Sequence, residues 1–88
     1  MSGSTTPIRL SAHAREQLAY RGTSDAEVTE AIRTAPWQPA ELGRWECRKT
    51  FRYDSTWHGK RYQIKEVRPI FAEEARELVV VTVYAYYR

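Results

Sequence analysis

The sequence predicts a small α+β domain in which two N-terminal helices pack on one face of a mostly antiparallel four-stranded sheet, in the order β-α-α-β-β-β. Helix signals occur only in residues 11–36, an alternation of period two begins at Arg44, and the final residues are strongly β-forming. The 88 residues fit one domain, which we expect over residues 8–88 after a flexible polar leader at 1–7.

The first helix is expected directly after a short strand at Ile8–Leu10. Ser11 suits the N-cap of a helix that runs from Ala12 to Tyr20 or Arg21. Gly22 stands where a helix commonly ends in a left-handed residue. These signals place both ends of the helix.

The second helix is predicted by a capping box. The Ser24 side chain can accept from the backbone amide of Glu27, whose carboxylate can reach back to the Ser24 amide. The helix then covers Asp25–Thr34 and is stopped by Pro36. Its apolar stripe predicts that three side chains are buried: Val28, Ala31 and Ile32.

The strands follow a linker at residues 36–43. The alternation from Arg44 predicts a strand at 44–53, with Trp45, Cys47, Phe51 and Tyr53 on one face and Lys49 as the exception there. We expect a turn at 54–59, a strand at 60–68 with a bulge or strand end near Glu66, and a connection at 69–77. Leu78–Tyr87 is apolar on both faces, which is typical of a central strand.

Positive charge gathers in the middle of the chain. The net charge is +3, yet residues 44–68 hold eight basic and three acidic residues, a local excess of +5. If the helices cover one face of the sheet, the other should carry the tyrosines or their neighbours from the last strand together with Arg44, Arg48, Arg52, Arg61 and Lys65. Cations interleaved with aromatic residues suit RNA, whereas the alternative is a solvated strand pair that is basic by chance.

Several stretches carry a resemblance to a known family: L-S-A-H-A at residues 10–14, R-G at 21–22, G-R-W-E-C-R-K at 43–49, Y-Q-I-K-E-V-R-P at 62–69 and V-V-V-T-V-Y at 79–84. With these, the chain from Ile8 onward resembles a family of small bacterial domains of unknown function, allied to the BrnT toxins and more distantly to the RelE/ParE toxin superfamily. The resemblance implies a RelE/ParE-like fold and a cognate antitoxin as partner. One departure is Gln17, which stands where a basic residue often follows the H-A pair.

Metal-free RNA cleavage needs a base for the 2′-hydroxyl, a cation for the phosphorane and an acid for the leaving oxygen. We take four residues as catalytic candidates: His13, Arg48, Lys65 and Tyr84. Arginine clamps phosphate, and a lysine among cations has a lowered pKa. We expect His13, Arg48 and Lys65 to converge on one groove. The residues assigned to nucleic-acid binding are Arg21, Arg44, Lys49, Arg52, Arg61 and Tyr86.

Each candidate also has a purely structural interpretation. The arginines can serve solubility, and the tyrosines can serve sheet packing. His13, Gln17 and Arg21 form one polar stripe of the first helix. In that stripe His13 can bond the backbone or an acidic side chain, and Arg21 can compensate the helix dipole.

The sequence lacks the spacing of a metal site among His13, Cys47 and His58, so we expect neither a metal nor a cofactor. A single cysteine excludes an internal disulfide, and no apolar run has the length of a membrane span. No signal peptide is visible, and we expect a cytoplasmic location.

Three functions fit these residues. The first is the toxin of a type II toxin–antitoxin pair that cleaves mRNA or other RNA, alone or on the ribosome. The second is a non-catalytic module that binds nucleic acid or a partner protein, and the third is a poison of DNA gyrase. The sequence does not choose between them, and it leaves the oligomeric state open.

Overall fold

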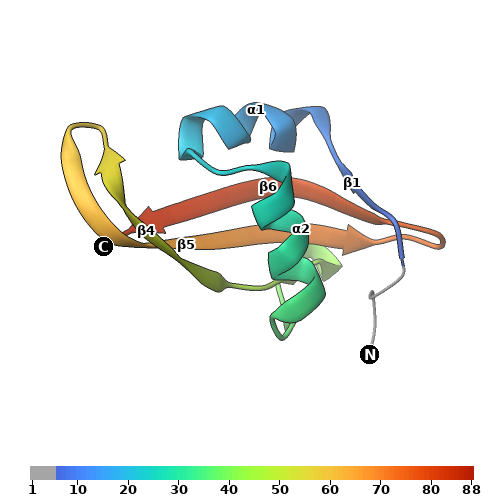
Figure 1. Cartoon of the computed structure of the whole chain (residues 1–88). Coiled ribbons are helices and arrows are strands. Elements are labelled where there is room, and N and C mark those ends of the chain that lie inside the picture. The colour runs from blue at the N-terminus through green and yellow to red at the C-terminus, as the bar shows by residue number, and fades with distance from the viewer. Residues whose placement is uncertain (1–5) are drawn as a thin grey trace.

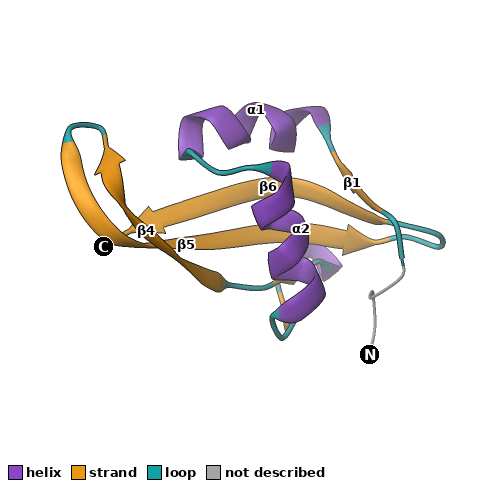
Figure 2. Ribbon diagram, viewed as in Figure 1, coloured by secondary structure: helices purple, strands orange, loops and turns teal. Residues whose placement is uncertain are grey.

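The computed structural model describes residues 6–88, so residues 1–5 of the expected leader lie outside the described part. These residues form an α+β domain of two helices and six strands that extends 42 Å along its longest axis (Figures 1 and 2). Its elements are β1 (Ile8–Leu10), α1 (Ala12–Arg21), α2 (Asp25–Thr34), β2 (Gln38–Pro39), a short 3-10 turn (Glu41–Gly43), β3 (Trp45–Glu46), β4 (Lys49–Trp57), β5 (Lys60–Glu73) and β6 (Leu78–Tyr87).

The sheet has the order β1-β6-β5-β3-β2, and β4 pairs with the first part of β5 on the same side as β3. All pairs are antiparallel except β1 with β6. The prediction of four strands is wrong, since there are six. The expected linker at 36–43 contains β2, and the expected strand at 44–53 breaks at Cys47 and Arg48 into β3 and β4.

The turn and the connection predicted in the second half are both shorter than expected. Only His58 and Gly59 form the turn, with φ of 54° and 79°, as in the two-residue turns that match the twist of a hairpin. β5 continues through Pro69 to Glu73 instead of ending at Arg68. The Pro69 carbonyl accepts from the Cys47 amide, beside the break between β3 and β4, so the missing proline N–H interrupts no ladder of hydrogen bonds there.

Both predicted helices are confirmed, and so are their caps. The Ser11 side chain accepts from the Ala14 amide at 3.1 Å, and both bonds of the Ser24–Glu27 capping box are present. Gly22 ends α1 with φ of 70°. A Cβ atom at Gly22 would lie 2.5 Å from the Trp57 ring, so the close approach as well as the backbone requires glycine at this joint.

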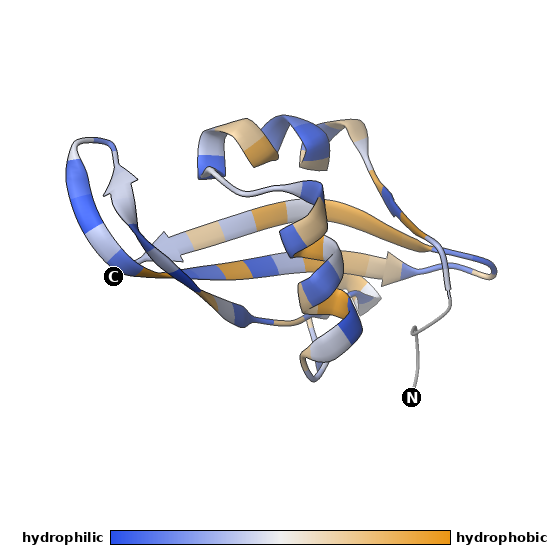
Figure 3. Ribbon diagram, in the orientation of Figure 1, coloured by the Kyte–Doolittle hydropathy of each residue, from blue (hydrophilic) through white to orange (hydrophobic). Residues whose placement is uncertain are grey.

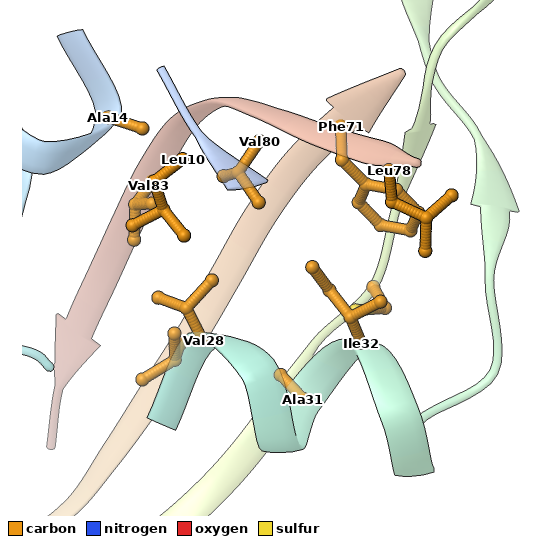
Figure 4. Packing of buried hydrophobic residues seen from close by; sticks show 11 residues of the cluster. Leu10, Ala14, Val28, Ala31, Ile32, Phe71, Leu78, Val80 and Val83 are labelled. Atoms are coloured by element: carbon orange, nitrogen blue, oxygen red, sulfur yellow. The ribbon is translucent and has the colours of Figure 1, made fainter. Parts of the chain in front are cut away.

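The hydrophobic core lies between the helices and one face of β5 and β6. The predicted burial of Val28, Ala31 and Ile32 is confirmed, and these side chains of α2 point toward β5 and β6 (Figure 4). Phe71 is the largest of the fully buried side chains. Burying a side chain of this size contributes about 1.5–3 kcal/mol. Figure 3 shows that the apolar residues of β6 are concentrated in its first half, which starts at the turn after β5.

The register of β5 and β6 defines the two faces of the sheet. Residues 67, 69, 71, 80 and 83 are buried on the side of the helices, which we call the covered face. Their neighbours form the open face: Glu66, Arg68, Ile70, Thr82, Tyr84 and Tyr86. The predicted bulge or strand end near Glu66 is wrong, because β5 continues to Glu73 and the shift in its pairing with β6 falls between Ile70 and Phe71.

α1 lies along β6 beyond the end of β1. β1 pairs only with the first three residues of β6, and the amide of Ser11 then donates to the Val80 carbonyl at 2.9 Å. α1 consequently packs against β6 where no strand borders it, and its polar side chains can reach the open face around that edge. Within residues 6–88, neither helix has the length and apolar character needed to cross a membrane.

Candidate functional site

Lys65 lies on the covered face, so its predicted place among open-face cations is wrong. It is 6% exposed, and its Nζ donates to the Gly22 carbonyl and to Glu27 Oε1, each at 2.9 Å. The physical reason is the alternation of β5: the buried residues Val67 and Phe71 fix the inward face, and Lys65 shares it. Lys65 cannot meet His13 and Arg48 in one groove, which corrects that expectation too.

Three further predicted cations lie away from the site built below. Lys49 is on the side of α2, with its Nζ 3.8 Å from Glu30, so the sequence placed it correctly as the exception on the apolar face. Arg52 and Arg61 belong to the β4–β5 hairpin, at the yellow end of Figure 1. Arg52 is 88% exposed and lies 3.7 Å from Asp54, so it is a solvated surface charge.

Arg48 belongs to a separate charge cluster. Arg48 Nη1 donates to the Glu66 carboxylate at 3.2 Å, and Arg88 Nη1 donates to the same carboxylate at 2.7 Å. The hydrogen bond from Arg88, helped by Arg48 and opposed by burial, lowers the pKa of Glu66 below its ordinary value. Because Glu66 is opposite Tyr86 in the register, this cluster occupies the open face close to the end of β6.

Two residues of the α1 stripe do reach the open face. His13 Nε2 lies 3.4 Å from Thr82 Oγ1, and the guanidinium carbon of Arg21 lies 5.3 Å from the centre of the Tyr84 ring. Arg21 Nε also donates to Gln17 Oε1 at 3.0 Å, which orients the guanidinium along the helix. The stripe that the sequence predicted therefore borders the second half of β6.

Arg68, which sequence reasoning did not select, completes this arrangement. Its guanidinium carbon lies 5.3 Å from the Tyr84 ring, so Tyr84 has an arginine on each side. Arg68 donates to Glu46 Oε1 through Nη2 at 2.6 Å and Nε at 3.0 Å, and to Tyr86 Oη at 3.1 Å. The bond to Glu46 is the largest influence that raises the pKa of Arg68. Fixing Val67 and Phe71 as inward residues would have revealed Arg68, because the next positions must face outward.

A groove of about 650 Å³ runs along the open face beside these residues. One wall is the β2–β3 hairpin and the floor is β5 and β6; the lining residues are Pro39, Ala40, Glu41, Leu42, Arg44, Glu46, Arg68, Ile70, Thr82 and Tyr84. Of the predicted site residues, Arg44 and Tyr84 line the groove, whereas His13, Arg21 and Tyr86 contact residues that line it. The Arg44 side chain has no hydrogen-bonding or ionic partner among residues 6–88.

The groove thus combines groups that suit phosphodiester chemistry. The His13 imidazole can accept a proton from a substrate, and the Tyr84 phenol can donate one. Two guanidiniums flank the phenol and can donate hydrogen bonds to anionic oxygens. Thr82 and Tyr84 are two residues apart on the open face of β6, so the imidazole that contacts Thr82 lies on the same face as the phenol. A phosphate group bound between them could contact both.

Cys47 and the acidic residues do not form a competing site. Cys47 is 2% exposed, and burial raises the pKa of its thiol to about 12, so it is a core thiol as its alternation with Trp45 indicated. In the part of the chain that the structure describes, no three His, Cys, Asp or Glu residues are grouped as ligands of a metal ion.

Comparison of the chain with known protein families, with curated proteins and with solved structures gave no match.

Proposed function

We propose that the chain is a metal-independent endoribonuclease that acts on mRNA or other RNA, as the toxin of a type II toxin–antitoxin pair. One observation carries the proposal: Tyr84 lies between Arg21 and Arg68, each 5.3 Å from its ring centre, next to the His13–Thr82 contact. The resemblance of the sequence to the BrnT and RelE/ParE toxins supports the toxin assignment and a RelE/ParE-like fold. It also suggests an antitoxin partner, for which an acidic segment would suit these arginines.

In the proposed reaction, neutral His13 takes the proton of the ribose 2′-hydroxyl. The 2′-oxygen forms a bond to phosphorus while the bond from phosphorus to the 5′-oxygen breaks, and Tyr84 donates its proton to that leaving oxygen. Arg21 and Arg68 donate hydrogen bonds to the phosphorane oxygens, whose negative charge grows in the transition state. The products are a 2′,3′-cyclic phosphate and a 5′-hydroxyl, after which solvent restores both protonation states.

Cleavage of a single-stranded RNA in the presence of EDTA tests this proposal. We expect the purified chain to release fragments that end in a 2′,3′-cyclic phosphate. His13→Ala and Arg21→Ala should each lower the rate roughly 100-fold, because a single proton-transfer or charge-stabilising group supplies about that factor.

The matched control is Arg52→Ala, since Arg52 is an exposed arginine outside the groove. It should cleave at the wild-type rate. Thermal unfolding of every variant confirms that the fold is intact. Cleavage by a folded His13→Ala variant at the wild-type rate would refute the assigned role.

A second candidate function is a non-catalytic module that binds nucleic acid or a partner protein. It is favoured by the carboxylates on the open face, because Glu46 and Glu66 already neutralise Arg68 and Arg48. Such a module would bind RNA or a partner in a salt-sensitive manner and release no product, so the cleavage assay separates the two functions.

A further inference from the structure

The tip of the β2–β3 hairpin has an unusual residue for its conformation. The Arg44 amide donates to the Glu41 carbonyl at 3.2 Å, which closes a tight turn around Leu42 and Gly43. Both central residues have positive φ, 62° and 72°. Turns of this kind favour Asn-Gly, because asparagine tolerates the left-handed region and leucine does not. Leu42 is therefore strained.

Leu42 also contributes nothing to the core. It is 83% exposed, the most exposed of the large hydrophobic residues in the described chain. A leucine that is disfavoured by its backbone and left in water is not there for stability, and strain of this type is concentrated at functional sites. Its position agrees, because Leu42 lines the groove that also contains Arg44, Arg68 and Tyr84.

The groove is lined by both cationic and apolar side chains. Arg44 and Arg68 offer guanidiniums that suit phosphate, whereas Pro39, Leu42 and Ile70 supply apolar surface to the same groove. A nucleotide has the matching division between an anionic phosphate and the apolar face of a base. Only an unstacked base exposes that face, which is the situation in single-stranded RNA and not in a duplex.

We propose that Leu42 is a specificity-determining residue that packs against an unstacked base, and that it restricts the groove to single-stranded RNA. This inference rests on the proposed function, since it uses the same groove. The inference predicts that Leu42, which is strained in the turn, also selects single-stranded RNA as the substrate.

Replacement of Leu42 by asparagine separates stability from binding. The probe is a fluorescein-labelled twelve-nucleotide RNA with 2′-O-methyl groups, which cannot be cleaved, measured both single-stranded and within a duplex. Leu42→Asn should raise the melting temperature by roughly 4 °C, because the turn is relieved. It should weaken single-strand binding roughly tenfold, because an apolar contact with a base is lost. Binding of the duplex should remain unchanged.

Two control variants sharpen the result. Leu42→Met keeps an apolar side chain and should bind single strands within about twofold of the wild type, since packing against a base needs only an apolar surface of similar size. Tyr20→Asn removes another exposed hydrophobic residue, 74% exposed on α1 and outside the groove lining, and should leave binding unchanged.

The inference is overturned if Leu42→Asn binds the single strand as tightly as the wild type, or if this variant melts at a lower temperature. A wild-type chain that binds the probe but never cleaves natural RNA refutes the ribonuclease proposal and leaves the role of Leu42 standing. Cleavage by a Leu42→Asn variant with unchanged affinity refutes the role of Leu42 alone.

Discussion

Lys65 and Arg68 are three residues apart on β5, and each forms an ion pair with a glutamate, yet their surroundings differ. Lys65 Nζ is 2.9 Å from Glu27 and its side chain is 7% exposed, while Arg68 Nη2 is 2.6 Å from Glu46 and its side chain is 24% exposed. Lys65 donates its hydrogen bonds to Glu27 on α2 and to the Gly22 carbonyl in the turn before α2. Arg68 lines the groove, where its guanidinium packs against the Tyr84 ring. The face of the strand therefore decides whether a cation supports the fold or the site.

The largest effect is expected when the inner pair is broken. Lys65→Ala leaves Glu27 and the Gly22 carbonyl without their common donor in a partly buried place. We expect a loss of about 3 kcal/mol in the free energy of unfolding, measured in urea. The double variant Lys65→Met with Glu27→Gln should recover most of that loss, because it removes both charges and keeps an acceptor for the Ser24 amide in the capping box. A Lys65→Ala variant as stable as the wild type would contradict the difference between the two faces.

The opposite result is expected for the outer pair. Arg68→Ala should lower the rate of RNA cleavage roughly 100-fold, because a group that stabilises the transition state is removed. Its cost in unfolding free energy should be only about 1 kcal/mol, since the residue remains in contact with solvent. Arg68→Lys retains the charge without the planar fork and should recover stability more fully than activity. Equal recovery of both would argue against a role in the reaction.

A smaller effect is expected from the hydroxyl group that joins β6 to the helices. Tyr87 Oη donates to the Arg21 carbonyl and, at 3.2 Å, to the Gly22 carbonyl. Tyr87→Phe keeps the ring stacked on Trp57, 5.1 Å away, and removes only these hydrogen bonds. We expect a loss of about 1 kcal/mol in urea unfolding. Tyr20→Phe is the matched control, because Tyr20 is 74% exposed on α1, and it should leave stability nearly unchanged.

The smallest effect is expected in how the free energy of unfolding changes at acidic pH. Burial raises the pKa of Glu27, but hydrogen bonds from Lys65 and Thr23 outweigh it, and the net shift is downward from 4.5. The unfolded chain therefore takes up a proton before the folded chain as the pH falls. The stability that Glu27 contributes is complete above about pH 4.5 and is lost as the pH falls toward its lowered pKa. Glu27→Gln should flatten this part of the curve of unfolding free energy against pH, and an unchanged slope would contradict the shift.

The helices were predictable because their signals are local. Ser11, Gly22 and the capping box at Ser24 each act within a few residues, so the sequence alone fixed both ends of α1 and α2. The end of β5 was not predictable in this way. Pro69 indicates a strand end by local rules, and only the break between β3 and β4, set by tertiary pairing, allows the strand to continue.

The site was predictable in part. The stripe of His13 and Arg21 followed from helical spacing, and Tyr84 followed from its position on a β-forming segment. The face of Lys65 could not be read from charge, because alternation holds a lysine inside whenever Val67 and Phe71 must be buried. The same alternation would have placed Arg68 on the open face, but its partners could not be predicted, since they come from β3 and β6 rather than from nearby sequence.

The bond between Tyr87 and the joint after α1 has a consequence for the order in which the molecule is completed. The two partners are 66 positions apart in the chain, so the helix that carries His13 and Arg21 is synthesised long before the strand that fastens it. A chain cut short before Tyr87 would keep every side chain that lines the groove, and Tyr86 beside it, but would lose both the hydroxyl and the ring that hold the end of α1. The proposed activity would then arise only once synthesis has passed that residue.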